Sequence, residues 1–131
     1  MDLTVDTSVI LAVVLNEPTK SQLIEVTRGA ELMSAPSLHW EVGNALSALF
    51  RRRRLSLVQA QVALESYRQI PLRMPEVELS AAVSLSDQHG IYAYDAYVLE
   101  CARRYQTPLL SLDGQQLRVA RQEGIETIEV S

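Results

Sequence analysis

The sequence predicts one α/β domain over residues 1–131, in which a mostly parallel sheet of about five strands is flanked by helices in a three-layer α/β/α arrangement. Short apolar segments with the length of strands alternate along the chain with segments of helical periodicity. The 131 residues, 47% of them hydrophobic, can bury one core but are too few for two. No linker, internal repeat or low-complexity segment interrupts this alternation.

The first half of the chain predicts two strands and four helices. In order, these elements are expected at residues 3–5, 8–16, 19–28, 32–34, 36–53 and 56–69. Pro18 follows the first helix, and Gly29 suits the C-terminal cap of the second. Pro36 stands in the first turn of the long helix, and Ser56 suits the N-cap of the next.

The second half predicts three further strands and three helices, at residues 72–74, 78–89, 94–105, 109–112, 115–123 and 125–130. The strand at residues 72–74 lies between Pro71 and Pro75, which favours an edge of the sheet. The single cysteine, Cys101, lies in a helical segment, where we expect it to be a small core residue.

Composition and charge restrict the class of protein. One cysteine excludes an internal disulfide, no apolar run reaches the length of a membrane span, and no basic region opens the chain. We therefore expect a cytoplasmic protein that does not engage a membrane. The net charge of −4 argues against strong nonspecific binding of nucleic acid, although residues 51–54 form a run of four arginines.

Four acidic residues recur where predicted strands end and helices begin. Asp6 follows the first strand, Glu41 lies early in the long helix, Asp95 opens a later helix and Asp113 follows the fourth strand. In a parallel sheet these junctions share one edge, where open α/β proteins place their chemistry. Taken singly, each acid suits a structural role as a helix cap or as a partner of the helix dipole.

Taken together, the four acids favour a metal site. Two bare carboxylates about 4 Å apart repel by roughly 4 kcal/mol at an effective dielectric constant of about 20, so four on one edge need a counter-charge. Oxygen ligands suit Mg²⁺ or Mn²⁺. Neither His39 nor His89 stands at ligand spacing from these acids, so we expect both to be structural or on the surface, and zinc is disfavoured.

The sequence resembles the PIN-domain nucleases, and among them the VapC-type toxins of prokaryotic toxin–antitoxin pairs. The resemblance covers essentially the whole chain. It rests on Val5-Asp6-Thr7-Ser8, on Glu41 with Asn44, on Tyr94-Asp95-Ala96, and on Leu110-Ser111-Leu112-Asp113. Many relatives carry a serine or threonine shortly before the third acid, whereas Ile91, Tyr92 and Ala93 occupy that stretch here.

The resemblance implies an endoribonuclease in which Asp6, Glu41, Asp95 and Asp113 bind Mg²⁺ or Mn²⁺. It implies hydrolysis that leaves a 5′-phosphate and a 3′-hydroxyl. Ser8 matches the hydroxyl beside the first acid, where it would position water or support Asp6, whereas Thr7 is expected to serve the turn.

Three further residues are candidates for supporting or RNA-binding roles. Asn44 is three residues after Glu41 and shares its helix face, so it could bond the carboxylate or a phosphate, or be a polar residue of a helix contact. Arg52 returns to nearly the same face about 16 Å further along, although an arginine run at a helix end is also favoured by the dipole alone. Aromatic residues at helical spacing near the acids are expected mostly to pack in the core, and Trp40 or Tyr92 is the best candidate if one of them stacks on a base.

Two other readings stay open at this stage. The chain could be a catalytically silent domain of the same fold that binds RNA or protein as a regulator. It could also be a phosphatase with Asp6 as nucleophile, but Ser8 stands where dehalogenase-like phosphatases place a second Asp, and Lys20 is the only lysine. A dinucleotide site is disfavoured because no glycine-rich turn follows the first strand.

The resemblance also implies protein partners. VapC-type toxins are neutralised by a cognate antitoxin whose C-terminal segment covers the acidic groove, often with an arginine near the carboxylates, and they typically form homodimers. The apolar residues Leu23, Ile24 and Val26, or the helix at residues 57–67, could supply a dimer interface or belong to the core.

Overall fold

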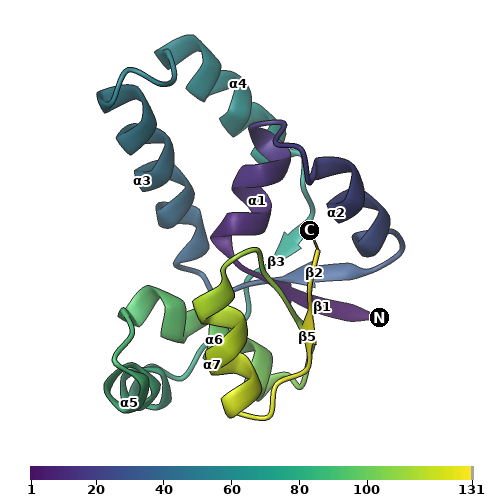
Figure 1. Ribbon diagram of the computed structural model, residues 1–131, viewed down its shortest axis with the longest axis vertical. Helices are drawn as coiled ribbons and strands as arrows, with labels where there is room; N and C mark the ends of the chain where they lie inside the picture. Colours follow the sequence, from purple (N-terminus) through teal and green to yellow (C-terminus); the bar gives the residue numbers. More distant parts are fainter. Residues whose placement is uncertain (131) are drawn as a thin grey trace.

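A parallel sheet of five short strands forms the centre of the computed structural model, which describes residues 1–130 (Figure 1). The strands are β1 (Asp2–Val5), β2 (Glu31–Met33), β3 (Leu72–Arg73), β4 (Leu109–Leu110) and β5 (Thr127–Ile128), and they lie side by side in the order β3-β2-β1-β4-β5. Leu3 pairs with Leu32, and Thr4 pairs with Leu109 on the other side. The predicted α/β fold and the edge position of the strand near residue 72 are both confirmed.

Helices cover both faces of the sheet, as the three-layer prediction requires. On one face pack α1 (Thr7–Val14), α2 (Lys20–Thr27), α3 (Leu38–Arg51) and α4 (Leu57–Arg68); on the other pack α5 (Leu79–His89), α6 (Ala93–Arg104) and α7 (Gly114–Gln122). β4 supplies both cores, since Leu110 belongs to the first and Leu109 to the second. Successive side chains of a strand point to opposite faces, which accounts for this division.

Two predicted strands are too long. β4 ends at Leu110 rather than at residue 112, because the next two residues bond to side chains instead of to a neighbouring strand: the Ser111 hydroxyl donates to Asp6, and the Leu112 amide donates to Ser8. β5 covers only Thr127–Ile128 of the predicted 125–130, and it pairs with β4 alone. The long helix also runs over Leu38–Arg51 rather than to residue 53, because Arg53 has a φ of +59°, which a right-handed helix does not allow.

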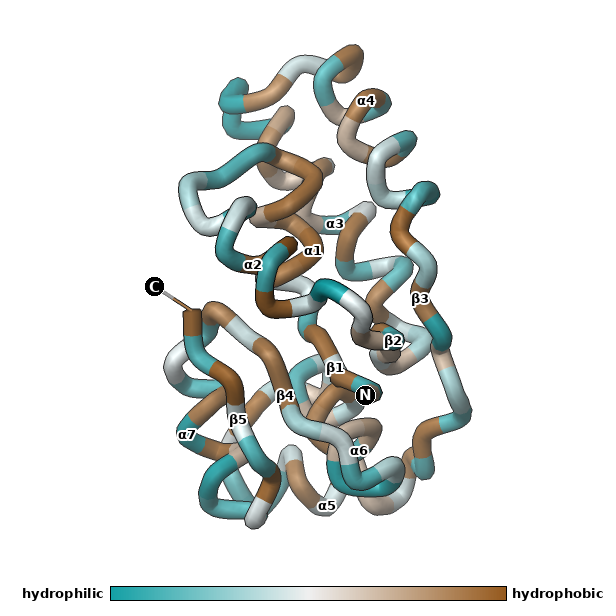
Figure 2. Tube along the Cα trace, turned by 90° about the vertical axis from the view of Figure 1, so that its right-hand side faces the viewer, coloured by the Kyte–Doolittle hydropathy of each residue, from teal (hydrophilic) through white to brown (hydrophobic). Residues whose placement is uncertain are grey.

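Helices α3 and α4 extend together beyond the sheet as a helical hairpin, whose tip carries the arginines of residues 51–54 (Figure 1). Apolar segments concentrate along β1, β4 and α1, at the centre of the fold (Figure 2). Cys101 is fully buried in α6, as expected. Across residues 1–130, no helix combines the length and apolar character that crossing a membrane requires.

Candidate active site

The four predicted acids lie on elements that begin at the carboxyl edge of the sheet. Asp6 follows β1 directly, and Asp113 is the N-cap of α7, just beyond β4. Glu41 and Asp95 lie in the first turns of α3 and α6. The charges of these residues act on one another: Asp113 and Asp6 both raise the pKa of Asp95, and Asp95 and Asp6 both raise the pKa of Glu41. The four acids are therefore near enough to influence one another's charge, and their role as a joint metal site stays a prediction.

Asp6 is held by two serine hydroxyls from distant parts of the chain. Ser8 donates to Asp6 Oδ1 at 2.5 Å, and Ser111 donates to Asp6 Oδ2. Asp6 stands at the N-cap position of α1, yet its side chain makes no capping hydrogen bond there. Burial raises the pKa of Asp6, the two serines and the Val9 amide lower it, and the charge of Asp113 raises it again. The Val9 amide thus lies near the Asp6 carboxylate without completing a capping hydrogen bond, and the two serines are the groups that hold this carboxylate.

A chain of hydrogen bonds continues from these serines across the site. Ser8 Oγ accepts from the Leu112 amide at 3.0 Å, and Ser111 Oγ accepts from the Asp113 amide at 3.0 Å. Each serine oxygen thus accepts one backbone N–H, and its own proton is donated to the Asp6 carboxylate, which can only accept when it is ionised. The sequence analysis identified Ser8 as a site residue but not Ser111, although Ser111 lies in the segment Leu110-Ser111-Leu112-Asp113 that carries part of the family resemblance. The available signal was the position of Ser111, between a predicted strand and one of the four acids.

Asp113 does cap a helix. Its Oδ1 accepts from the amides of Gln115 at 2.9 Å and Gln116 at 3.4 Å. The expected role of Asp113 as a helix cap is therefore correct for this oxygen. Asp113 remains exposed, and within residues 1–130 its hydrogen bonds involve Oδ1 alone. The buried Gln116 reaches across to donate to the backbone carbonyl of Asp95 at 3.0 Å, which ties the start of α7 to the start of α6. Gln116 is a second residue that the sequence analysis missed.

Glu41 carries the most strongly altered carboxyl group of the site. Burial raises its pKa to about 7, and the charges of Asp95 and Asp6 add to the effect. The nearby hydroxyls of Thr7 and Ser37 lower the pKa in part, but neither completes a hydrogen bond of good geometry. Glu41 Oε2, Thr7 Oγ1 and Ser37 Oγ are all buried without a partner. Thr7, expected only to serve the turn, thus places its hydroxyl beside this carboxyl group.

Asp95 lies at the third position of α6 rather than at its cap, which is Tyr92. Burial raises its pKa first, and the charges of Asp113 and Asp6 raise it further. Among residues 1–130 no side chain donates a hydrogen bond to the Asp95 carboxylate. The serine or threonine that many relatives carry near residues 91–93 is absent here. Gln116 compensates only in part, because it bonds to the backbone carbonyl of Asp95 and not to its carboxylate.

The donor set suits a hard divalent cation. It consists of carboxylate and hydroxyl oxygens, it includes a buried carboxylate oxygen without a partner, and three of its acids have raised pKa values that a cation would lower. In the described part of the chain, no three acidic, histidine or cysteine side chains already stand close enough to hold a metal ion. Capping by Asp113 Oδ1 is one reason, because it turns that oxygen toward α7.

The residues predicted to contact RNA are all exposed on the surface. Trp40 is 69% exposed next to Glu41, and Tyr92 is 84% exposed at the cap of α6, so core packing explains neither. Asn44 is exposed one turn beyond Glu41. Arg52 is exposed at the tip of the hairpin. The two histidines serve elsewhere, since His39 contacts Tyr67 at 3.3 Å and His89 contacts Glu123 at 2.8 Å.

Comparison with known families identifies the domain. The PIN domain family matches residues 3–122, which include all four acids. A search of the sequence against curated proteins gives no match.

Solved structures share the fold at low sequence identity. PAE2754 from Pyrobaculum aerophilum has a TM-score of 0.74 at 20% identity, with 98% of this chain and 92% of that chain covered. VapBC2 from Rickettsia felis, bound to a DNA fragment from the VapBC2 promoter, has a TM-score of 0.71 at 12% identity and full coverage of both chains, 100% and 100%. FitAcB from Neisseria gonorrhoeae has a TM-score of 0.62 at 16% identity, with 96% of each chain covered.

Proposed function

Since this chain belongs to the PIN domain family, we propose that it is a metal-dependent endoribonuclease, the toxin of a VapBC-type toxin–antitoxin pair. The observation that carries the proposal is the group of four mutually repelling carboxyl groups at one edge of the sheet, with Glu41 Oε2 buried and unpaired. Such a group is costly to a protein that leaves it without a cation.

Asp6, Glu41, Asp95 and Asp113 would hold Mg²⁺ or Mn²⁺. When bound, the ion supplies a Lewis acid that makes water a better nucleophile and offsets the charge that develops on the phosphate. Ser8 and Ser111 fix the Asp6 carboxylate through both oxygens, so that its orientation is set before substrate arrives. The pKa of Glu41 is raised to about 7 in the metal-free protein, and a bound cation would lower it and so favour the carboxylate form that binds the ion.

Substrate contacts would come from the exposed residues around the acids. Trp40 presents an aromatic face on which an unpaired base can stack. Asn44 can donate to a phosphate oxygen, and Arg52 can meet the RNA backbone further along α3. The positive charge at the hairpin tip offsets locally the net charge of −4 of the whole chain.

The proposal includes protein partners and a place of action. A cognate antitoxin with an arginine would neutralise the acidic edge of the sheet, which is a surface of complementary charge. A homodimer would form through exposed apolar side chains: Ile24 on α2, or Leu57, Val58 and Val62 on α4, are available, whereas Leu23 is buried in the core. The chain would act in the cytoplasm, where its RNA substrate is found.

The test is incubation of the purified protein with structured RNAs in the presence of Mg²⁺, Mn²⁺ or a chelator. We expect cleavage that needs the metal and leaves 5′-phosphate ends. Asp6→Asn should abolish it while circular dichroism stays that of the parent. Metal binding without cleavage by the parent would favour the silent RNA- or protein-binding regulator instead. Cleavage by Asp6→Asn at the rate of the parent would show that the site is assigned to the wrong residues.

A further inference from the structure

A cavity of about 270 Å³ lies between the start of α3, the loop that follows β3, the start of α5, and α6. Its lining consists of Ala35, Pro36, Ser37, Glu76, Val77, Leu79 and Tyr97. Ser37 lies one helical turn before Glu41, and Tyr97 lies two residues after Asp95. The two helices that supply acids to the site therefore also supply walls to this cavity.

The residues that line the cavity have the chemical character to bind a flat ring with a polar edge. Most of the lining is apolar, and Leu79 keeps 62% of its surface exposed although it is a large hydrophobic residue. The Tyr97 ring is held in place by an edge-to-face contact with Tyr94, with 6.0 Å between the ring centroids. The volume is near the lower limit of about 300 Å³ for sites that enclose drug-sized molecules, so it can hold one base but not a whole nucleotide.

Two polar groups mark the cavity as a site for a specific ligand. Ser37 Oγ is buried beside the Glu41 carboxyl group without completing a hydrogen bond of good geometry, although serine at the start of a helix normally caps it. Glu76 supplies a carboxylate, and its backbone carbonyl accepts a hydrogen bond from the Tyr105 hydroxyl at 2.7 Å, which anchors the loop. A phosphate would be repelled by Glu76 and Glu41, so the ligand must be uncharged or positive and must offer donors.

We propose that this cavity receives one base of the RNA strand next to the cleaved phosphate, and that it prefers guanine. The inference rests on the proposed function, whose substrate preference it specifies. Guanine presents two adjacent donors, N1–H and the N2 amino group, which a carboxylate can accept together. Uracil offers one donor between two carbonyl oxygens, which Glu76 repels. A well-made bidentate contact distinguishes bases by about 1–3 kcal/mol, and Tyr97 would stack on the ring.

The direct test does not depend on cleavage. Titration of ¹⁵N-labelled protein with guanosine, adenosine, cytidine and uridine should shift the amides of residues 76–79 and 97, with guanosine binding at least about fivefold tighter than uridine. Glu76→Gln should remove that preference. Glu126→Gln, an exposed acid on the opposite side of the fold, is the matched control and should behave like the parent.

A second pair of variants tests the cavity itself. Leu79→Trp should fill it and abolish the nucleoside shifts, whereas Val83→Trp adds the same ring to an exposed position of α5 outside the lining and should not. Equal thermal unfolding of both variants shows that neither has lost its fold. In RNA cleavage, Glu76→Gln should flatten the base preference at one position beside the cut.

The outcomes separate the two proposals. If RNA is not cut but guanosine binds selectively, the nuclease proposal fails and the cavity assignment stands. If RNA is cut while the four nucleosides bind equally or not at all, the cavity assignment is wrong. Tighter binding of arginine amide than of guanosine would also overturn it, because the cavity would then be a receptor for a protein side chain.

Discussion

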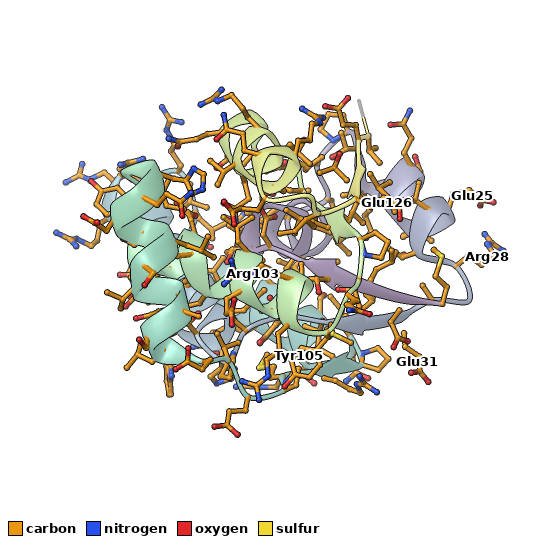
Figure 3. The ribbon with its side chains drawn as sticks, turned by 90° about the horizontal axis from the view of Figure 1, so that it is seen from below. Glu25, Arg28, Glu31, Arg103, Tyr105 and Glu126 are labelled. Carbon is orange, nitrogen blue, oxygen red and sulfur yellow. The ribbon has the colours of Figure 1, made fainter. Side chains whose placement is uncertain are left out.

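Two groups of carboxylates lie at opposite ends of the α6 and α7 helices, and they differ in what neutralises them. At the C-terminal ends, Arg103 contacts Glu100 at 2.7 Å and Glu123 at 3.2 Å, and His89 contacts Glu123 at 2.8 Å. Arg103 lies within the outline of the fold, whereas the exposed pair of Glu25 and Arg28 projects from its edge (Figure 3). The buried acids at this end therefore have cationic partners.

At the N-terminal ends the acids have no such partners. Among the ion pairs of residues 1–130, none includes Asp6, Glu41, Asp95 or Asp113, and hydroxyls and amides are the groups that approach them. This protein therefore does pair acids of low exposure with an arginine, at positions where the acids contribute only to contacts between helices. The absence of an arginine or lysine partner from the second group supports the proposal that it receives an external cation.

Two acids on α6 allow the sharpest comparison, because they stand only five residues apart. Asp95→Asn should lower the rate of metal-dependent RNA cleavage at least about a hundredfold, more than the loss of a supporting group causes, and leave stability nearly unchanged. Glu100→Gln should instead leave the rate per folded molecule unchanged and lower the free energy of unfolding by about 1–2 kcal/mol, because it weakens a bond to Arg103. Cleavage assays and urea unfolding of both variants check this. The comparison fails if each variant changes the same property.

The next largest effect is expected at Ser111. Ser111→Ala removes one of the two donors that hold Asp6, so metal affinity and cleavage should each fall about 10–100-fold. Ser34→Ala is the matched control, because Ser34 is a buried serine whose hydroxyl bonds only to the Val5 carbonyl. Isothermal titration with Mn²⁺ gives the affinity. Equal losses in the two variants would mean that Ser111 acts on the fold and not on Asp6.

The raised pKa of Glu41 predicts a pH dependence of stability. Between its ordinary value of 4.5 and about 7, the folded protein keeps a proton that the unfolded chain loses, so stability in chelator should fall as pH rises through this window. Glu41→Gln removes the effect and should make the metal-free protein about 1 kcal/mol more stable at pH 8 than the parent, a value reduced because the group is partly exposed. Urea unfolding at pH 5 and pH 8 measures both. A parent that is more stable at pH 8 than at pH 5 contradicts the prediction.

The smallest effect is expected among the arginines. Arg103 is held by two acids, whereas no ion pair of residues 1–130 includes an arginine of residues 51–54. If Arg52 binds a phosphate, Arg52→Gln should reduce the slope of log affinity against log salt by nearly one unit for RNA bound to the Asp6→Asn protein. An unchanged slope would mean that Arg52 is only a solvated residue at the end of its helix.

The sequence was sufficient for the fold and for the four acids, because each depends on local pattern. Alternation of apolar segments predicts the parallel sheet, and Asp6 and Asp113 directly follow strands. The sequence could not reveal the supporting residues, because their roles depend on contacts between residues that are far apart in the chain. Ser111 and Gln116 act through partners 105 and 21 residues away, and no local pattern distinguishes them from other polar residues near a helix start. The strand ends were also misplaced for this reason, since Ser111 and Leu112 leave the sheet to bond to Asp6 and Ser8.

A hydrogen bond from Ser111 to Asp6 joins two points of the chain that are 105 residues apart. Asp6 directly follows β1, whereas the hydroxyl that fixes it and the capping acid Asp113 lie just beyond β4. A fragment that stops before β4 carries three of the four acids and lacks the strand that leads to Ser111 and Asp113. In such a fragment the Asp6 carboxylate keeps only the hydroxyl of Ser8, so its orientation is set by one serine instead of two.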